Sequence, residues 1–219
     1  MRTILVLNAK GGSGKTTVAT NLAGYFASEG AKVALVDYDP QGSSIDWLRV
    51  RPSDRPKITA VDGATKSVRV PRRAEIVIMD APSRTHDEQL AALVRRAQTI
   101  ILPVVPSPID IRAAERFLTE LRALRNVIRT DVKVTTIANR VREGTLIANE
   151  LEDYLFGLKL PSGRKMPFLT MLRSSTNYLK AAEKGLSIFE FAPIPTAGDR
   201  EYWSPLLRWL KSARSLPKK

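Results

Sequence analysis

The sequence contains no cysteine and only one histidine among its 219 residues. The lack of cysteine excludes a disulfide framework, a thiolate zinc site and a thiol nucleophile. The histidine, His86, has no metal-ligating or nucleophilic cluster around it, and we expect it to begin a helix. No run of about 18 apolar residues occurs, so the sequence predicts no membrane span. Since the chain also enters an apolar strand pattern without the regions of a secretory signal, we expect a cytoplasmic protein.

Acidic residues are scarce relative to basic ones: 22 Asp and Glu stand against 35 Lys and Arg, for a formal net charge of +13. Residues 1–111 carry a net charge of +4 and residues 112–219 carry +9. A bound nucleotide does not need basic groups spread so widely. A polyanionic partner does, because each Lys or Arg that docks on a phosphate releases a counterion. On charge alone, a nucleic-acid partner and a generally basic, solvated surface remain comparable explanations.

Glycine is concentrated near the N-terminus, in the segment Lys10-Gly11-Gly12-Ser13-Gly14-Lys15-Thr16-Thr17. An apolar run precedes this segment and a helical pattern follows it, which is the context of a phosphate-binding loop. We expect residues 11–17 to hold phosphate through backbone N–H groups at the positive end of the helix. Lys15 would reach the terminal phosphates and the Thr16 hydroxyl would ligate Mg²⁺. The sequence therefore predicts a nucleotide-binding protein.

Short apolar runs alternate with helical patterns along the chain. Strands are predicted at 3–8, 32–37, 75–80, 99–105 and 132–138, with an edge strand at 168–172 after a loop at 161–167. Helices are predicted at 16–28, 86–97, 111–128, 145–157, 177–184 and 200–213. Continuous runs rich in Val and Ile are typical of strands buried on both faces. The alternation predicts an α/β fold of the P-loop type, a mostly parallel sheet flanked by helices on both faces. Without a linker or repeat, we expect residues 1–219 to form a single domain.

Aspartates follow two of the predicted strands, at the edge where ligands bind in open α/β sheets. Asp80 follows the apolar residues 76–79, the pattern of a Walker B strand whose acid faces Mg²⁺ through a water. Asp39 is interpreted either as part of a switch segment that orients the attacking water or as a turn residue before Pro40. Thr16, Asp39 and Asp80 are the candidate Mg²⁺ ligands.

Together these motifs resemble those of the ParA/MinD family of deviant-Walker P-loop ATPases. The resemblance rests on the extra lysine Lys10 before the phosphate loop, on Asp37-Tyr38-Asp39-Pro40-Gln41 and on Asp80-Ala81-Pro82. Further matches at 103–108, at Arg173 and at 185–189 spread the resemblance over nearly the whole chain. The short chain looks like the small ParA-type positioning and partition proteins.

The resemblance implies ATP with Mg²⁺ as cofactor, a slow intrinsic ATPase activity and a homodimer formed around ATP. The implied catalytic residues are Lys10, Lys15 and Asp39, with Lys10 reaching the nucleotide of the second subunit. A lysine at the start of the loop can neutralise charge in this way because it projects beyond its own phosphate site. Asn139 would lie near the adenine, although an ordinary turn asparagine fits the pattern equally well.

The resemblance also implies that the ATP-bound dimer binds double-stranded DNA without sequence preference. The candidate contacts are Arg173, Lys180 and Lys184, which suit backbone binding because no base-reading pattern accompanies them. A cargo-adaptor protein would stimulate hydrolysis and release the ATPase from the nucleoid. The cargo would be a plasmid, a carboxysome or another intracellular complex.

Two other functions stay open at the level of sequence. Trp203, Leu206, Leu207 and Leu210 fall on one face of a helix, which fits either a MinD-like membrane-associated switch or a helix that closes the core. The core interpretation is favoured because the domain needs a closing helix. A metabolic P-loop enzyme, such as a ligase similar to dethiobiotin synthetase, would not need the positive charge of the second half.

Overall fold

The computed structural model describes residues 1–65, 68–83, 85, 87–128, 131–160 and 163–217. The strands are β1 (Arg2–Val6), β2 (Val33–Asp37), β3 (Ile58–Asp62), β4 (Ile76–Asp80), β5 (Thr99–Val104), β6 (Lys133–Val141) and β7 (Phe168–Arg173). The helices are α1 (Lys15–Ser28), α2 (Ser43–Arg49), α3 (Asp87–Arg96), α4 (Pro108–Ile128), α5 (Leu146–Gly157), α6 (Asn177–Ala182), α7 (Pro193–Glu201) and α8 (Ser204–Lys211). A short 3-10 turn, η1 (Ala213–Ser215), follows α8.

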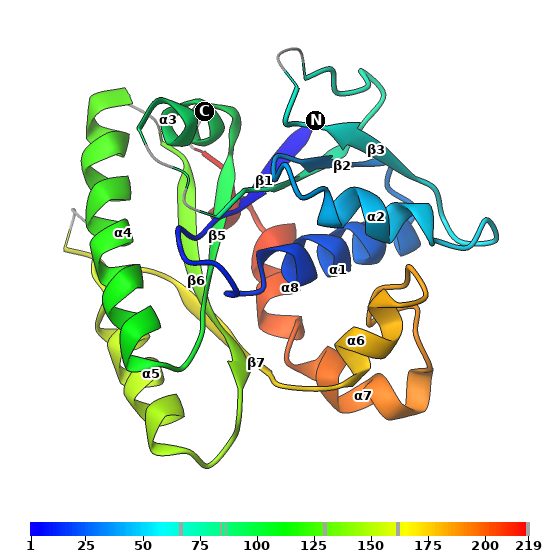
Figure 1. Cartoon of the computed structure of the whole chain (residues 1–219). Helices are drawn as coiled ribbons and strands as arrows, with labels where there is room; N and C mark the ends of the chain where they lie inside the picture. The colour runs from blue at the N-terminus through cyan, green and yellow to red at the C-terminus, as the bar shows by residue number, and fades with distance from the viewer. Residues whose placement is uncertain (66–67, 84, 86, 129–130, 161–162, 218–219) are drawn as a thin grey trace.

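The seven strands form one sheet in the order β3-β2-β4-β1-β5-β6-β7, and every pairing is parallel. Helices α3, α4 and α5 cover one face of the sheet, and α1, α2 and α8 cover the other (Figure 1). Two apolar cores result, because the side chains of each strand alternate between the two faces. The predicted α/β fold with a parallel sheet flanked by helices is confirmed.

The C-terminal helix α8 completes the second of these cores. Trp203, Leu206 and Leu210 are fully buried there, and Leu207 is nearly so. Arg2 of β1 donates hydrogen bonds to the Leu210 carbonyl and to the Ser215 hydroxyl, which fixes the end of the chain to the sheet. The core interpretation of this helix is therefore confirmed. Within the described ranges, no helix is both long enough and apolar enough to cross a membrane.

Three elements differ from the sequence prediction. Strand β3 was missed because it is an edge strand with exposed Ala60 and Asp62, which gives it no continuous apolar run. Helix α2 was missed because its seven residues are too few for a clear helical period. Helix α7 was missed, since it lies mostly before the helix predicted at 200–213, which corresponds mainly to α8. Pro205 lies in the first turn of α8, where its missing N–H costs nothing.

The remaining predicted boundaries agree to within a few residues, with two exceptions. Strand β6 continues to Val141 through a register shift, where Arg140 has a φ of 55°. His86 and residues 161–162 of the predicted loop lie outside the described residues. The predicted edge strand is confirmed as β7, which forms the edge of the sheet opposite β3.

All strands run in one direction, so their carboxyl ends meet at one edge of the sheet. In the register, Val6 of β1 and Asp37 of β2 are both Cα partners of Asp80 on β4. The strand order reverses at β1: strands β2, β3 and β4 lie on one side of it, and β5, β6 and β7 lie on the other. Ligands bind at such reversal points in open α/β sheets.

Candidate nucleotide site

The glycine-rich loop joins β1 to α1 at this edge. Gly12 and Gly14 have φ values of 80° and 85°, in the left-handed region where a side chain is strained. Gly14 is also the N-cap of α1, and with no side chain it leaves the first N–H groups of the helix available. The loop therefore presents backbone donors at the positive end of a helix, as a phosphate site requires.

Two buried asparagines hold the loop in place. Asn139 Nδ2 donates to the Ser13 carbonyl at 2.8 Å, and a Cβ on Gly14 would come within 2.2 Å of that nitrogen. Asn8 Oδ1 accepts the Lys10 N–H at 3.0 Å, while Asn8 Nδ2 donates to the Pro103 carbonyl at 2.7 Å. The predicted role of Asn139 at the adenine stays a prediction. Sequence reasoning missed Asn8, whose only signal is its position as the last residue of the strand predicted at 3–8.

Lys15 is 7% exposed and lies over its own loop, where its Nζ donates to the Lys10 carbonyl at 3.3 Å. Burial lowers the pKa of Lys15, and the nearby carboxylates of Asp80 and Asp39 oppose that effect. The structure thus brings together three of the predicted site residues: one ammonium and two carboxylates. A cation held in this way at the loop can attract the terminal phosphates of a nucleotide.

Asp80 provides an oxygen that is suited to a metal. Its Oδ2 accepts the Ser44 hydroxyl at 2.6 Å, whereas its Oδ1 is buried and has no hydrogen-bond partner among the described residues. Burial raises the pKa of Asp80 to about 6, despite the opposing effects of the Ser44 and Thr16 hydroxyls and of Lys15. A buried carboxylate oxygen next to the Thr16 hydroxyl is the donor chemistry that Mg²⁺ prefers, so these residues fit the implied ion.

Mg²⁺ in nucleotide sites takes one or two protein carboxylates and completes its shell with phosphates and water. The described part of the chain accordingly needs no dense cluster of ligands, and it contains no group of three or more His, Cys, Asp or Glu residues arranged for a metal.

The segment after β2 folds around Asp37. The Asp37 carboxylate accepts backbone N–H groups of Asp39 at 3.0 Å, Ser44 at 2.7 Å and Ile45 at 3.2 Å. Burial raises the pKa of Asp37, and these hydrogen bonds counteract the rise. Asp39 Oδ1 accepts the Gln41 N–H at 3.0 Å, as a turn aspartate does, and its role toward water stays a prediction. Ser44 joins this segment to Asp80, a link that sequence reasoning missed because α2 was not predicted.

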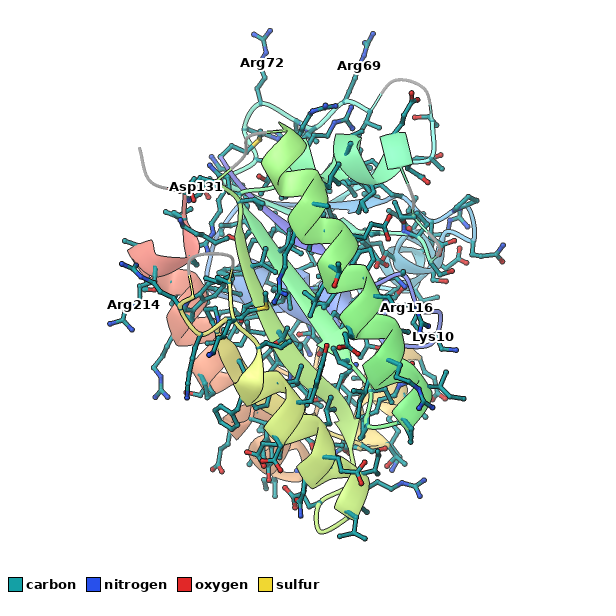
Figure 2. All side chains as sticks on the ribbon, turned by 90° about the vertical axis from the view of Figure 1, so that its left-hand side faces the viewer. Lys10, Arg69, Arg72, Arg116, Asp131 and Arg214 are labelled. Carbon is teal, nitrogen blue, oxygen red and sulfur yellow. The ribbon has the colours of Figure 1, made fainter. Side chains whose placement is uncertain are left out.

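Lys10, the additional lysine, lies at the surface next to the loop (Figure 2). In the described part of the structure, no carboxylate lies within ion-pair distance of its ammonium. Its charge is thus available to a group outside the protomer.

The candidate DNA-binding residues differ in whether their side chains are bonded within the protein or exposed at its surface. Arg173 Nε donates to the fully buried carboxylate of Asp199, which also accepts the Ser175 hydroxyl at 3.0 Å and the Asn177 amide at 2.6 Å. These bonds to Asp199 raise the pKa of Arg173, and its side chain is 37% exposed. Arg173 therefore fixes the end of β7 to α7, whereas Lys180 and Lys184 are exposed on and just after α6.

Comparisons with known proteins agree with this fold. The carboxysome-distribution maintenance protein A of Gloeobacter kilaueensis is 29% identical over 200 residues, covering 87% of this chain and 85% of that protein. The chromosome-partitioning ATPase Soj of Thermus thermophilus is 29% identical over 227 residues, covering 88% and 89%. A solved ATP complex of a Cyanothece McdA variant superposes with a TM-score of 0.71 at 17% identity, covering 94% of this chain and 96% of that one. The model of the CobQ/CobB/MinD/ParA nucleotide-binding domain matches residues 4–188, and the chain belongs to that family, within which the sequence resembles the ParA/MinD ATPases.

Proposed function

We propose that residues 1–219 form a single ParA-type ATPase domain that dimerises around ATP and positions or segregates an intracellular cargo. The observation that carries this proposal is the surplus lysine. Lys15 already serves the protomer's own phosphate loop, and the half-buried side chain of Lys10 has no carboxylate partner among the described residues. A second cation at the loop is useful when another subunit's phosphates approach it.

Within the protomer, the N–H groups of residues 11–17 would hold the phosphates and Lys15 would contact the terminal ones. Thr16 and Asp80 would hold Mg²⁺, which supplies charge neutralisation between the phosphates when it is bound. Asp39 would orient the attacking water from its turn after β2. Hydrolysis should be slow in the isolated protein, and a cargo-adaptor protein would accelerate it.

The named relatives support the choice of cargo. One maintains carboxysome distribution and the other partitions chromosomes, so a compartment or a DNA molecule is the kind of cargo we propose here. The positive net charge of +13 supports sequence-independent binding of the ATP form to DNA, through exposed cations such as Lys180 and Lys184. The protein would then be cytoplasmic and associated with the nucleoid.

A mobility-shift assay tests the proposal. Two unrelated duplexes are titrated with protein in the presence of ADP, ATP or a slowly hydrolysed analogue, at low and at high salt. We expect the ATP forms to bind much more tightly than the ADP form, equally on both duplexes and less tightly at high salt. Protein that binds ATP without gaining affinity for DNA would contradict the DNA-based function and direct the work to liposomes.

Lys10→Ala is expected to remove ATP-dependent dimerisation while the protomer still binds ATP, because this side chain has no carboxylate partner in its own described chain. Size-exclusion chromatography with light scattering measures the change. Lys165→Ala, which removes an exposed lysine elsewhere, is the matched control. A Lys10→Ala protein that still dimerises with ATP would exclude the role across the interface.

Asp39→Ala is expected to slow ATP hydrolysis by about 100-fold or more and to trap an ATP-loaded dimer on DNA, since a positioned catalytic carboxylate contributes on that scale. Phosphate release and the lifetime of the DNA complex are the two measurements. Asp54→Ala, at an exposed aspartate, serves as control. Loss of ATP binding in place of trapping would show that the Asp39 turn is structural.

A further inference from the structure

A cavity of about 260 Å³ opens at the amino end of the sheet, opposite the phosphate loop. Its walls include Lys32, Lys57 and Arg73, together with Thr59 and Pro71. All three basic residues are exposed. We infer that this end of the protein is a second polyanion site, which takes the phosphates of a nucleic-acid duplex.

The three cations converge because of the sheet topology. Lys32 directly precedes β2, Lys57 directly precedes β3, and Arg73 lies just before β4. These strands are parallel neighbours in the order β3-β2-β4, and Val33 is the Cα partner of the first residue of each of the other two strands. The segments that enter the three strands are therefore held side by side by the ladder itself.

Two carboxylates near this cavity form contacts other than ion pairs with its three cations. Glu75 Oε2 accepts the backbone N–H of Lys32 at 2.8 Å, and Asp54 lies 3.9 Å from Arg55. Within the described ranges, no ion pair joins Lys32, Lys57 or Arg73 to a carboxylate. Glu75 offsets one positive charge at this end, and the cations still outnumber it.

The charge also extends beyond the cavity. Arg69 and Arg72 belong to the loop that supplies Arg73, and Figure 2 shows both side chains pointing outward into solvent at this end of the molecule. With Lys32, Lys57 and Arg73 they form what we call the amino-edge cluster. Cations that spread along a surface match a row of phosphates, whereas a single small anion needs donors that converge on one point. The duplex backbone is therefore the ligand chemistry that the cluster favours.

The amino-edge cluster is complete within one protomer. Strand β2 separates it from the nucleotide edge by five residues, about 16 Å at 3.3 Å per residue. Its affinity for DNA should therefore not depend on ATP or on dimerisation, unlike that of the proposed ATP-dependent surface. A protomer that has hydrolysed its ATP would still bind nearby DNA weakly.

Fluorescence anisotropy of a labelled short duplex tests this site with the ADP-loaded protein at several salt concentrations. We expect weak, salt-dependent binding by the wild type. In the variant Lys57→Gln/Arg73→Gln, the slope of log affinity against log salt should fall by about 2, since each phosphate contact contributes about 0.9, and the affinity should fall roughly tenfold. The control Arg208→Gln/Arg214→Gln removes the same charge from the exposed surface of α8 and η1 and should bind as the wild type does.

ATP hydrolysis and the unfolding temperature should be unchanged in both variants, because these exposed side chains lie outside the nucleotide edge. No ADP-state binding by the wild type, or an equal loss in the two variants, would overturn the inference. Displacement of the duplex by inorganic phosphate at equal total ionic strength would also overturn it, because it would identify a small-anion site. ATP-enhanced binding is read out separately in the same assay, so failure of the proposed function remains distinguishable.

Discussion

Replacing Lys15 by alanine is expected to abolish useful ATP binding, with a loss of about 3 kcal/mol or more, roughly 150-fold in affinity. Lys15 of the wild type is 7% exposed, and its ammonium lies near Asp80 and Asp39. Without it, two carboxylates face the incoming phosphates with no buried ammonium beside them to balance their charge. Calorimetric titration with ATP and Mg²⁺ measures the effect.

Lys10→Ala is the informative comparison, because both substitutions remove one lysine from the same loop. It should keep the protomer's ATP affinity and lose dimerisation, while Lys15→Ala loses both. An unfolding transition at the wild-type temperature in the absence of nucleotide would show that the Lys15→Ala protein is folded. ATP affinity retained by a folded Lys15→Ala protein would remove the basis for assigning this loop to phosphate.

The nucleotide edge was predictable because its signals are local. The glycines of the loop stand next to each other in sequence, and Asp80 directly follows an apolar strand. Parallel strands then bring Asp37 and Asp80 together without further information. The Ser44–Asp80 hydrogen bond could not be predicted, since it depends on where the short helix α2 lies against β4.

Charge counts along the chain were a weaker guide to the basic surfaces. They placed most of the positive excess in residues 112–219, where Arg173 turns out to be paired with a buried aspartate. The amino-edge cluster comes from the first half, because Lys32, Lys57 and Arg73 are far apart in sequence and meet only when β2, β3 and β4 align. Local patterns cannot reveal a cluster that tertiary pairing creates.

A buried ion pair fixes the end of α2 to the turn at 185–190. Arg51 Nη1 donates to Glu190 Oε2 and to the Gly185 carbonyl, both at 3.0 Å, and the two charged side chains are only 6% and 4% exposed. Glu190 Oε2 also accepts the N–H and hydroxyl of Ser187 at 2.9 and 2.7 Å. Gly185, with a φ of 63°, has no room for a Cβ, which would lie 2.5 Å from the Arg51 nitrogen.

Glu190→Ala is expected to lower the free energy of unfolding by about 3–5 kcal/mol, because it leaves the Arg51 guanidinium buried without its counter-charge. Urea unfolding at neutral pH measures the loss. Asp46→Ala breaks an ion pair with Arg49 in the same helix, but those side chains are 62% and 73% exposed, so its cost should stay below about 1 kcal/mol. Each variant removes one carboxylate from an ion pair, so comparing them separates the effect of burial from the effect of losing a charge.

Low pH should reduce the difference in the free energy of unfolding between the wild type and Glu190→Ala. Burial alone would raise the pKa of Glu190, but hydrogen bonds from Arg51 and Ser187 outweigh it and lower the pKa below the ordinary value of 4.5. A carboxyl group with a lowered folded-state pKa stabilises the fold above its unfolded pKa and loses that contribution as pH falls through the folded one. The stability gap between wild type and Glu190→Ala should therefore be full above about pH 4.5 and shrink below it. A gap that is small at neutral pH, or that grows in acid, would mean that the ion pair does not hold α2 to the 185–190 turn.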